Sequence, residues 1–255
     1  MHDVALSTYK KLSTMFYDLE DHIHNEQAQL FYAAQAQKVN GPLLEPMCGS
    51  GRFLLPLLKA GYDIEGFDAS EHMIALLQQK HAQLYAKPAP AWVAFMQHFV
   101  PERLYNLIFI PYGSLGLLCD KKDLMDGLQR LRSALAPTGK LLLEIDTVAS
   151  APGQEGVIKR AVRMNELGQH VALTFRVEYD KERQLFKAHS RYDLLIDGAV
   201  VETEQEVFEQ YLYRHNELED LLHAVGFTSI KKYPAFDESA QVDIHTPIII
   251  YECKN

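Results

Sequence analysis

Short apolar runs alternate along the chain with segments whose apolar residues recur at helical spacing. The runs lie at residues 43–44, 64–67, 91–95, 107–110 and 140–146. The intervening segments repeat leucines three or four positions apart, as at Leu124, Leu128 and Leu131. The run at 107–110 is apolar at every position, as a strand buried on both faces should be. The pattern predicts a doubly wound α/β protein with a mostly parallel sheet between two helical layers.

Residues 151–212 follow a different pattern. Apolar residues alternate with more polar ones, for example at Val171, Leu173 and Phe175. Asp197-Gly198 is a strong hairpin signal, and turn residues also occur at 167–168 and 180–183. We expect an antiparallel meander of about four strands, inserted after the fifth parallel strand. Its apolar face must cover something, and the nearest surface is the open carboxyl edge of the parallel sheet. The meander is therefore expected to be a substrate lid.

The two ends of the chain complete this organisation. Residues 4–38 are expected to be helical, with an apolar stripe that includes Tyr9, Leu12 and Phe16. They would form an N-terminal helical lid within residues 1–40. After the meander, the pattern predicts a helix at 216–225 and strands at 227–233 and 248–252. The predicted core comprises residues 41–150 and 213–255, and the inserted lid comprises residues 151–212.

A glycine-rich turn between the first strand and its helix is the candidate ligand site. Met47-Cys48-Gly49-Ser50-Gly51 follows the strand, and Asp68 ends the next strand, 17 residues after Gly51. Glycines let a backbone approach a ligand closely, and a helix that begins near Gly51 would direct free N–H groups at it. A strand-end acid at about this spacing accepts the hydroxyls of a ribose. Turn, helix and acid together predict a nucleoside-type ligand.

Two classes of nucleoside ligand compete for this turn. A dinucleotide site requires Gly-x-Gly-x-x-Gly, and Leu54 stands at the third glycine position. Residues 45–51 instead resemble motif I of class I S-adenosylmethionine-dependent methyltransferases, acid-x-Gly-x-Gly-x-Gly, with Met47 in place of the first glycine. The segment Gly66-Phe67-Asp68-Ala69-Ser70 and the closing helix with Gly226-Phe227 are similar to the same family.

The resemblance extends over nearly the whole chain. It implies a seven-stranded, mostly parallel, Rossmann-like sheet with a closing hairpin, and a small-molecule methyltransferase with a lid sheet after strand five. It also implies S-adenosyl-L-methionine as the cofactor, with its ribose on Asp68. In the family, an acid after strand three holds the adenine, and Met96 and Gln97 stand in its place here. The residues expected to bind the cofactor are Tyr17, Glu45, Met47, Gly49, Gly51, Arg52, Asp68, Ala69, Met73, Met96, Gln97 and Pro111.

The sequence does not identify which residues would act on the methyl acceptor. Tyr112 follows the fourth strand and Asp146 ends the fifth, where doubly wound sheets bind ligands. His189 and Tyr192 lie on the predicted lid. Each of the four is a candidate for deprotonating an amine, and the pattern does not choose among them. Since a sulfonium already activates the methyl group, the resemblance implies direct in-line displacement that needs alignment but no catalytic triad and no metal.

Composition limits the classes of partner that we expect this protein to bind. The 255-residue chain carries 34 acids and 25 bases, a formal net charge of −9, and nucleic-acid binding depends on clustered Lys and Arg. No apolar run approaches the roughly 20 residues of a membrane span, and the N-terminus lacks the features of a secretory signal. The cysteines Cys48, Cys119 and Cys253 have no metal-type spacing.

We therefore expect a cytoplasmic enzyme, monomeric or homodimeric, that methylates a small-molecule amine or hydroxyl without nucleic-acid or membrane partners. Two alternatives stay open. One is a nucleotide-binding oxidoreductase, and the other is a non-catalytic module that binds S-adenosylmethionine.

Overall fold

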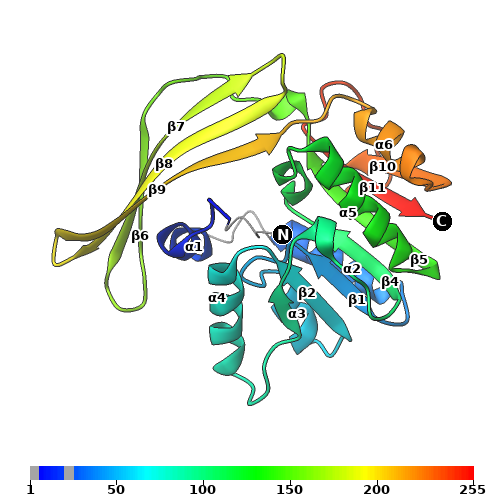
Figure 1. Ribbon diagram of the computed structural model, residues 1–255, viewed down its shortest axis with the longest axis horizontal. Helices are drawn as coiled ribbons and strands as arrows, with labels where there is room; N and C mark the ends of the chain where they lie inside the picture. The colour runs from blue at the N-terminus through cyan, green and yellow to red at the C-terminus, as the bar shows by residue number, and fades with distance from the viewer. Residues whose placement is uncertain (1–5, 20–25) are drawn as a thin grey trace.

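The computed structural model describes residues 6–19 and 26–255, and its central element is a seven-stranded sheet (Figure 1). The order across the sheet is β10-β11-β5-β4-β1-β2-β3. β11 is antiparallel to β10 and β5, and β1 to β5 pair in parallel. The predicted fold class and its closing hairpin are thereby confirmed. The strands are β1 (Leu43–Pro46), β2 (Ile64–Asp68), β3 (Ala91–Val93), β4 (Tyr105–Ile110), β5 (Leu135–Asp146), β10 (Ser229–Pro234) and β11 (Ile248–Lys254).

Helices cover both faces of this sheet, and β4 shows how its sequence serves both. Leu107 and Phe109 are buried on the face with the first helical group, whereas Ile108 and Ile110 are buried on the face with the second. Each such side chain contributes about 1.5–3 kcal/mol when fully buried. The first group is α2 (Glu26–Gln37), α3 (Leu54–Lys59) and α4 (Glu71–Ala82), and the second is α5 (Lys121–Ser133) and α6 (Glu217–Val225).

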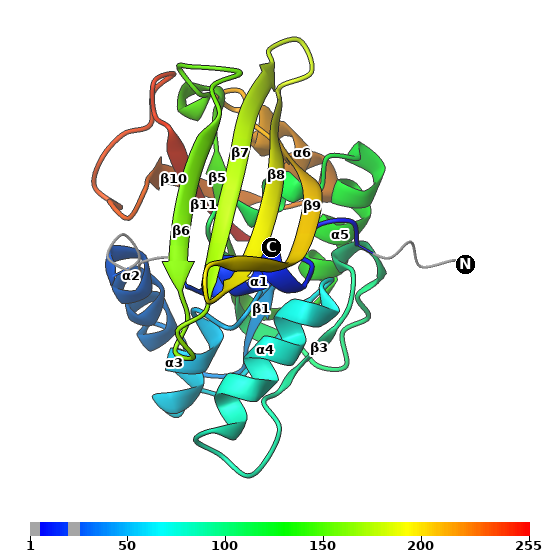
Figure 2. The ribbon, with the colours of Figure 1, turned by 90° about the vertical axis from the view of Figure 1, so that its left-hand side faces the viewer.

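A second, antiparallel sheet projects from this core. It consists of β6 (Lys159–Met164), β7 (His170–Asp180), β8 (Leu185–Ile196) and β9 (Ala199–Tyr211), in that order. Figures 1 and 2 show α1 (Lys11–Asp18) lying beneath it, next to the core. Leu12 and Phe16 of α1 are buried against Val171, Tyr192 and Leu194. The apolar face of the meander thus packs on α1, not directly on the edge of the parallel sheet as expected.

The N-terminal helix is capped by the second sheet. Lys10 occupies its N-cap position and supplies no side-chain cap, so its first N–H groups need acceptors from elsewhere. Glu204 Oε2 accepts a hydrogen bond from the Leu12 N–H at 2.7 Å. The Glu206 carboxylate accepts from the backbone N–H groups of Tyr9 and Lys10. Charge-assisted hydrogen bonds therefore join α1 and the residues just before it to β9.

The predicted helical segment at 4–38 contains two helices, and the spacing of Leu30, Phe31 and Ala34 also predicts the second of them. Residues 4, 5 and 20–25 lie outside the described residues, and the remainder forms α1 and α2. Tyr9 precedes α1 with a positive φ of 52°, so it is not part of the helical stripe. The division of the chain at residues 40, 150 and 212 stays a prediction.

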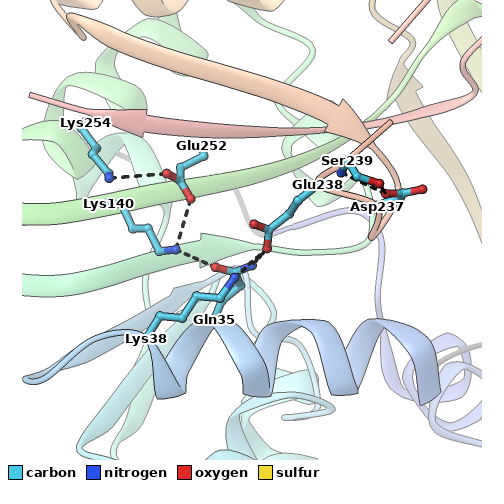
Figure 3. Close-up of polar contacts among 8 residues, drawn as sticks. All are labelled: Gln35, Lys38, Lys140, Asp237, Glu238, Ser239, Glu252 and Lys254. Carbon is cyan, nitrogen blue, oxygen red and sulfur yellow. Dashed lines mark hydrogen bonds and ion pairs between the residues drawn. The ribbon is translucent and has the colours of Figure 1, made fainter. Parts of the chain in front are cut away.

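A polar cluster holds α2 to the sheet (Figure 3). The Lys140 ammonium donates to Gln35 Oε1 at 2.6 Å and to Glu252 Oε2 at 3.2 Å. Gln35 and Lys38 both reach Glu238, in the loop between β10 and β11. Burying the Lys140 ammonium is tolerated because a carboxylate and an amide oxygen accept its protons. The cluster fixes α2, whose Tyr32 hydroxyl donates to Glu144 of β5.

Two boundaries differ from the pattern in the sequence, which predicts a helix at 123–135 that Pro137-Thr138-Gly139 ends. α5 begins at Lys121, because the Asp120 carboxylate accepts from the N–H groups of Lys122 and Asp123. β5 begins at Leu135, where pairing with Tyr105 precedes a register shift, although Pro137-Thr138-Gly139 suggested a loop there. In residues 6–19 and 26–255, no helix is both long and apolar enough to cross a membrane.

Candidate functional site

A cavity of about 580 Å³ lies where β1, β2, β3 and β4 end, beneath the N-terminal segment and β9. This is where a doubly wound sheet binds its ligands. Of the residues predicted to bind the cofactor, the cavity brings together Tyr17, Met47, Gly49, Asp68, Ala69, Met73, Met96 and Gln97. Glu45, Gly51, Arg52 and Pro111 are not among its lining residues.

Asp68 is fixed at the carboxyl end of β2. Its Oδ2 accepts the Gly49 N–H at 2.9 Å and its Oδ1 accepts the Ser70 N–H at 2.8 Å. Burial raises the pKa of the Asp68 carboxyl, and these two hydrogen bonds oppose the rise. A carboxylate oxygen has room for a further donor. Asp68 therefore both shapes the glycine turn and presents acceptors beside the cavity.

The turn itself is shaped for a close neighbour. Gly49 has a positive φ of 53°, and a Cβ there would have only Met73 Sδ within 4 Å, at 3.9 Å, so a side chain would occupy the open cavity. Met47 also has a positive φ, 58°, which explains why the resembling family places glycine there. Gly51 serves packing instead, because a Cβ would lie 2.9 Å from both Leu55 Cγ and Leu77 Cγ.

Glu45 lies buried beneath the turn. Its carboxylate accepts the Leu54 N–H, and burial, the largest influence, raises its pKa. α3 begins at Leu54, three residues after Gly51, and Glu45 accepts its first N–H group, so that group is not free for a ligand. Glu45 Oε2 and Gln97 Oε1 are buried without a hydrogen-bond partner among the described residues. These two acceptors fit a ligand that carries amino groups at both ends.

Arg52 is held between two aromatic rings. Its guanidinium carbon lies 4.2 Å from the Tyr17 ring centroid and 5.3 Å from that of Tyr112. It also donates to the Tyr17 backbone oxygen at 3.1 Å. Burial raises the pKa of Tyr17 to about 12, with Arg52 opposing, so Tyr17 stays a neutral phenol. Tyr17 lines the cavity and Arg52 does not. Arg52 therefore contacts the cavity wall from behind, at Tyr17.

The four candidates for acting on the acceptor do not meet in the cavity. Gln210 of β9 donates to Asp146 Oδ2 at 2.6 Å, and burial raises the pKa of this acid. Tyr112 packs with Arg52, and the Tyr192 ring centroid is 5.8 Å from that of Phe16. His189 Nε2 lies 3.2 Å from Glu178 Oε2, and strand alternation places it on the sheet face opposite Tyr192.

Glu144 supports the loop that follows β4. Its carboxylate accepts from the Tyr32 hydroxyl of α2 at 2.9 Å and from the Tyr112 N–H. Burial raises the pKa of Glu144 to about 7, and these two donors oppose the rise. Alternation along the strand predicts that Glu144 and Asp146 lie on one side of β5, as paired carboxylates or as solvated strand-end charges. The structure instead gives each acid a partner of its own.

Glu144→Gln tests the protonation of this support. The pKa of Glu144 rises from a usual 4.5 to about 7 on folding, so the folded state binds the extra proton between these pH values. The stabilisation that comes from protonated Glu144 is present below pH 4.5 and is lost as the pH rises through 7. Glutamine does not ionise. The quantity to compare is the free energy of unfolding of Glu144→Gln minus that of the unchanged protein. We expect this difference to increase by about 1–3 kcal/mol between pH 5 and pH 8. Urea denaturation at both pH values measures it, and a difference that does not change with pH would contradict the assignment.

Sequence reasoning missed the parts of the cavity wall that come from other elements. They are the N-terminal residues 6–8, residues 117–120 with Asp123 after β4, and residues 207–209 of β9. Asp120 could have been found, because a helix-capping acid in a strand-end loop is readable in sequence. Residues 207–209 carry no local signal. Within the described part of the chain, no group of three or more His, Cys, Asp or Glu residues is arranged to hold a metal ion.

This sheet order, with an acid-tipped second strand beside a glycine turn, defines a Rossmann-like protein of the nucleoside-binding type. The particular family follows from comparison of the whole sequence. The chain belongs to the methyltransferase domain family, whose model matches residues 15–232.

Individual proteins agree with this assignment. YqeM of Bacillus subtilis (strain 168), whose name places it among the methyltransferases, is 25% identical over 142 residues, 54% of this chain and 55% of YqeM, so the chain spans about half the length of this relative. An S-adenosylmethionine-dependent methyltransferase from Clostridium acetobutylicum ATCC 824 has a TM-score of 0.76 at 16% identity, over 94% of this chain and 97% of its own. The sugar N-methyltransferase KedS8 from Streptoalloteichus sp ATCC 53650 has a TM-score of 0.73 at 18% identity, over 100% and 99%. The two structures share the fold.

Proposed function

We propose that this protein transfers a methyl group from S-adenosyl-L-methionine to a small-molecule amine or hydroxyl by direct in-line displacement. The observation that carries the proposal is Asp68, which is bonded to Gly49 and Ser70 and faces a cavity of ligand size at the strand ends. Membership of the methyltransferase domain family supports the same chemistry.

Three residues of the wall, and Glu45 behind it, would hold the cofactor. Asp68 would accept the ribose hydroxyls, and Gly49 leaves space for the backbone to approach the ligand. Gln97 Oε1 would accept the adenine amino group, and Glu45 Oε2 would attract the methionine amino group from beneath the turn. When bound, the cofactor would supply an activated methyl group for transfer to the acceptor's lone pair, with S-adenosylhomocysteine as the other product. The displaced acceptor proton passes to solvent.

The N-terminal segment around Tyr9 and the adjacent strand β9 form the roof of the cavity, which excludes water from the methyl transfer. The Tyr9 ring lies edge-on to both Tyr17 and Phe208, each at a centroid distance of 6.1 Å. Ser70 Oγ donates to the Tyr9 backbone oxygen at 2.7 Å, which fastens the N-terminal segment to α4. Excluding water strengthens electrostatic interactions inside the cavity. We propose that α1 and the second sheet together serve as the substrate lid.

We further propose a cytoplasmic protein, monomeric or homodimeric, without nucleic-acid or membrane partners. The formal charge of −9 supports the lack of nucleic-acid partners.

Titration calorimetry with S-adenosylhomocysteine tests the cofactor assignment. We expect binding in the micromolar range and no heat with NAD or NADP. Nicotinamide binding without S-adenosylhomocysteine binding would favour an oxidoreductase. Binding without methyl transfer to any amine or phenol of a panel would favour a non-catalytic module.

A further inference from the structure

The walls of the cavity carry negative charge only. Among the described residues that line it there are four carboxylates, those of Asp68, Asp120, Asp123 and Glu209, and no Lys, Arg or His. A second feature of the wall is aromatic, since Tyr9, Tyr17 and Phe208 meet edge to face at the roof. Aromatic faces and carboxylates together are the surroundings that an organic cation prefers.

Two cations next to the cavity wall already have partners. Arg52 donates to the Tyr17 backbone oxygen and stacks on the Tyr17 ring, behind the wall. Lys187 forms an ion pair with Glu209. Neither is available for an anionic ligand unless an existing partner is given up. A phosphate or carboxylate on the acceptor would therefore meet no base among the described residues that line the cavity, and would lie against like charges.

Three of the four carboxylates are already committed within the protein, and one of them is Glu209, through its ion pair with Lys187. Asp68 holds the glycine turn, and Asp120 Oδ1 caps α5 through the N–H groups of Lys122 and Asp123. The Asp123 carboxylate makes no hydrogen bond or ion pair with any described residue, although it lines the cavity. It is half-buried in the first turn of α5, so it is the carboxylate most open to a ligand.

We propose that the acceptor is an amine that enters as its cation and carries no phosphate or carboxylate group. This inference rests on the proposed function and narrows its substrate class. The ammonium is attracted by Asp123 and by the aromatic roof, loses one proton to solvent, and then offers its nitrogen lone pair to the methyl carbon. The products are the N-methylated amine, one proton and S-adenosylhomocysteine.

Matched acceptor pairs test this proposal. The pairs are ethanolamine and phosphoethanolamine, tyramine and tyrosine, and glucosamine and glucosamine 6-phosphate, with S-adenosylhomocysteine release as the rate and calorimetric binding to the S-adenosylhomocysteine complex as a second readout. We expect the member without the anionic group to be favoured by at least about tenfold in rate or affinity. Equal or better use of the anionic member would overturn the proposal. So would retained S-adenosylhomocysteine binding with no preference in any pair, whereas loss of cofactor binding itself would overturn the proposed function.

Two variants with a matched control locate the effect. Asp123→Asn should raise the KM of the preferred amine several-fold and leave S-adenosylhomocysteine affinity unchanged. Glu209→Gln releases Lys187 and should narrow the discrimination against the anionic member. Asp126→Asn is the control, because this acid lies on the same helix, pairs with Lys122 and is not a lining residue. If Asp123→Asn and Asp126→Asn have the same KM for the amine, the assignment of Asp123 is wrong.

Discussion

Asp68→Ala should raise the dissociation constant of S-adenosylhomocysteine by about 10- to 100-fold. A charge-assisted hydrogen bond contributes about 1.5–3 kcal/mol, and each 1.4 kcal/mol is about tenfold in affinity. The substitution removes the expected ribose acceptor and also releases the Gly49 N–H, which Asp68 Oδ2 accepts at 2.9 Å. Titration calorimetry on the purified variant measures the change.

Two further variants serve as comparisons for Asp68→Ala. In Asp68→Asn, one side-chain oxygen becomes an NH₂ group that faces a backbone N–H, so at least one of the bonds to Gly49 and Ser70 is lost. Glu71→Ala is the control, because Glu71 is an exposed acid only three positions away at the start of α4. Wild-type affinity in Asp68→Ala, or an equal loss in Glu71→Ala, would contradict the ribose assignment.

Gly113→Ala should lower the free energy of unfolding by about 2–5 kcal/mol, combining left-handed strain with overpacking. Gly113 follows β4 with a φ of +62°, and a Cβ would lie 2.0 Å from Asp146 Oδ2 and 3.0 Å from Gln210 Nε2. The side chain would therefore separate Asp146 from Gln210, the hydrogen bond that joins β5 to β9. Urea denaturation followed by circular dichroism measures the loss.

Gly168→Ala provides the matched comparison. Gly168 also has a positive φ, +74°, but no atom lies within 4 Å of a Cβ placed there. Only the backbone strain remains, about 1–2 kcal/mol. Equal losses in the two variants would show that the contact with Asp146 and Gln210 carries no energy of its own.

The sequence predicts the core well because its signals are local and repeated. The apolar run at 107–110, the glycine turn and the acid at Asp68 each fix a strand or its end, and chain order then determines the sheet. The meander is equally readable, since strict alternation and Asp197-Gly198 define its hairpins.

The cavity wall is less predictable because three separate segments build it. Phe208 of β9 lies beside Tyr9 only because α1 packs between the second sheet and the core, and no local pattern records that contact. The packing constraint on Gly51 was not predicted, for a similar reason. Its neighbours Leu55 and Leu77 come from two helices, so a motif written along one strand and turn does not reveal the packing.

The capping of α1 by Glu204 and Glu206 has a consequence for how the protein is made. A helix of eight residues is not stable alone, and its acceptors are synthesised about 190 residues later than the helix itself. During translation the first helix to emerge must therefore wait for β9. A nascent chain that stops before β9 has the nucleoside turn but no roof, so premature products should lack a closed reaction chamber.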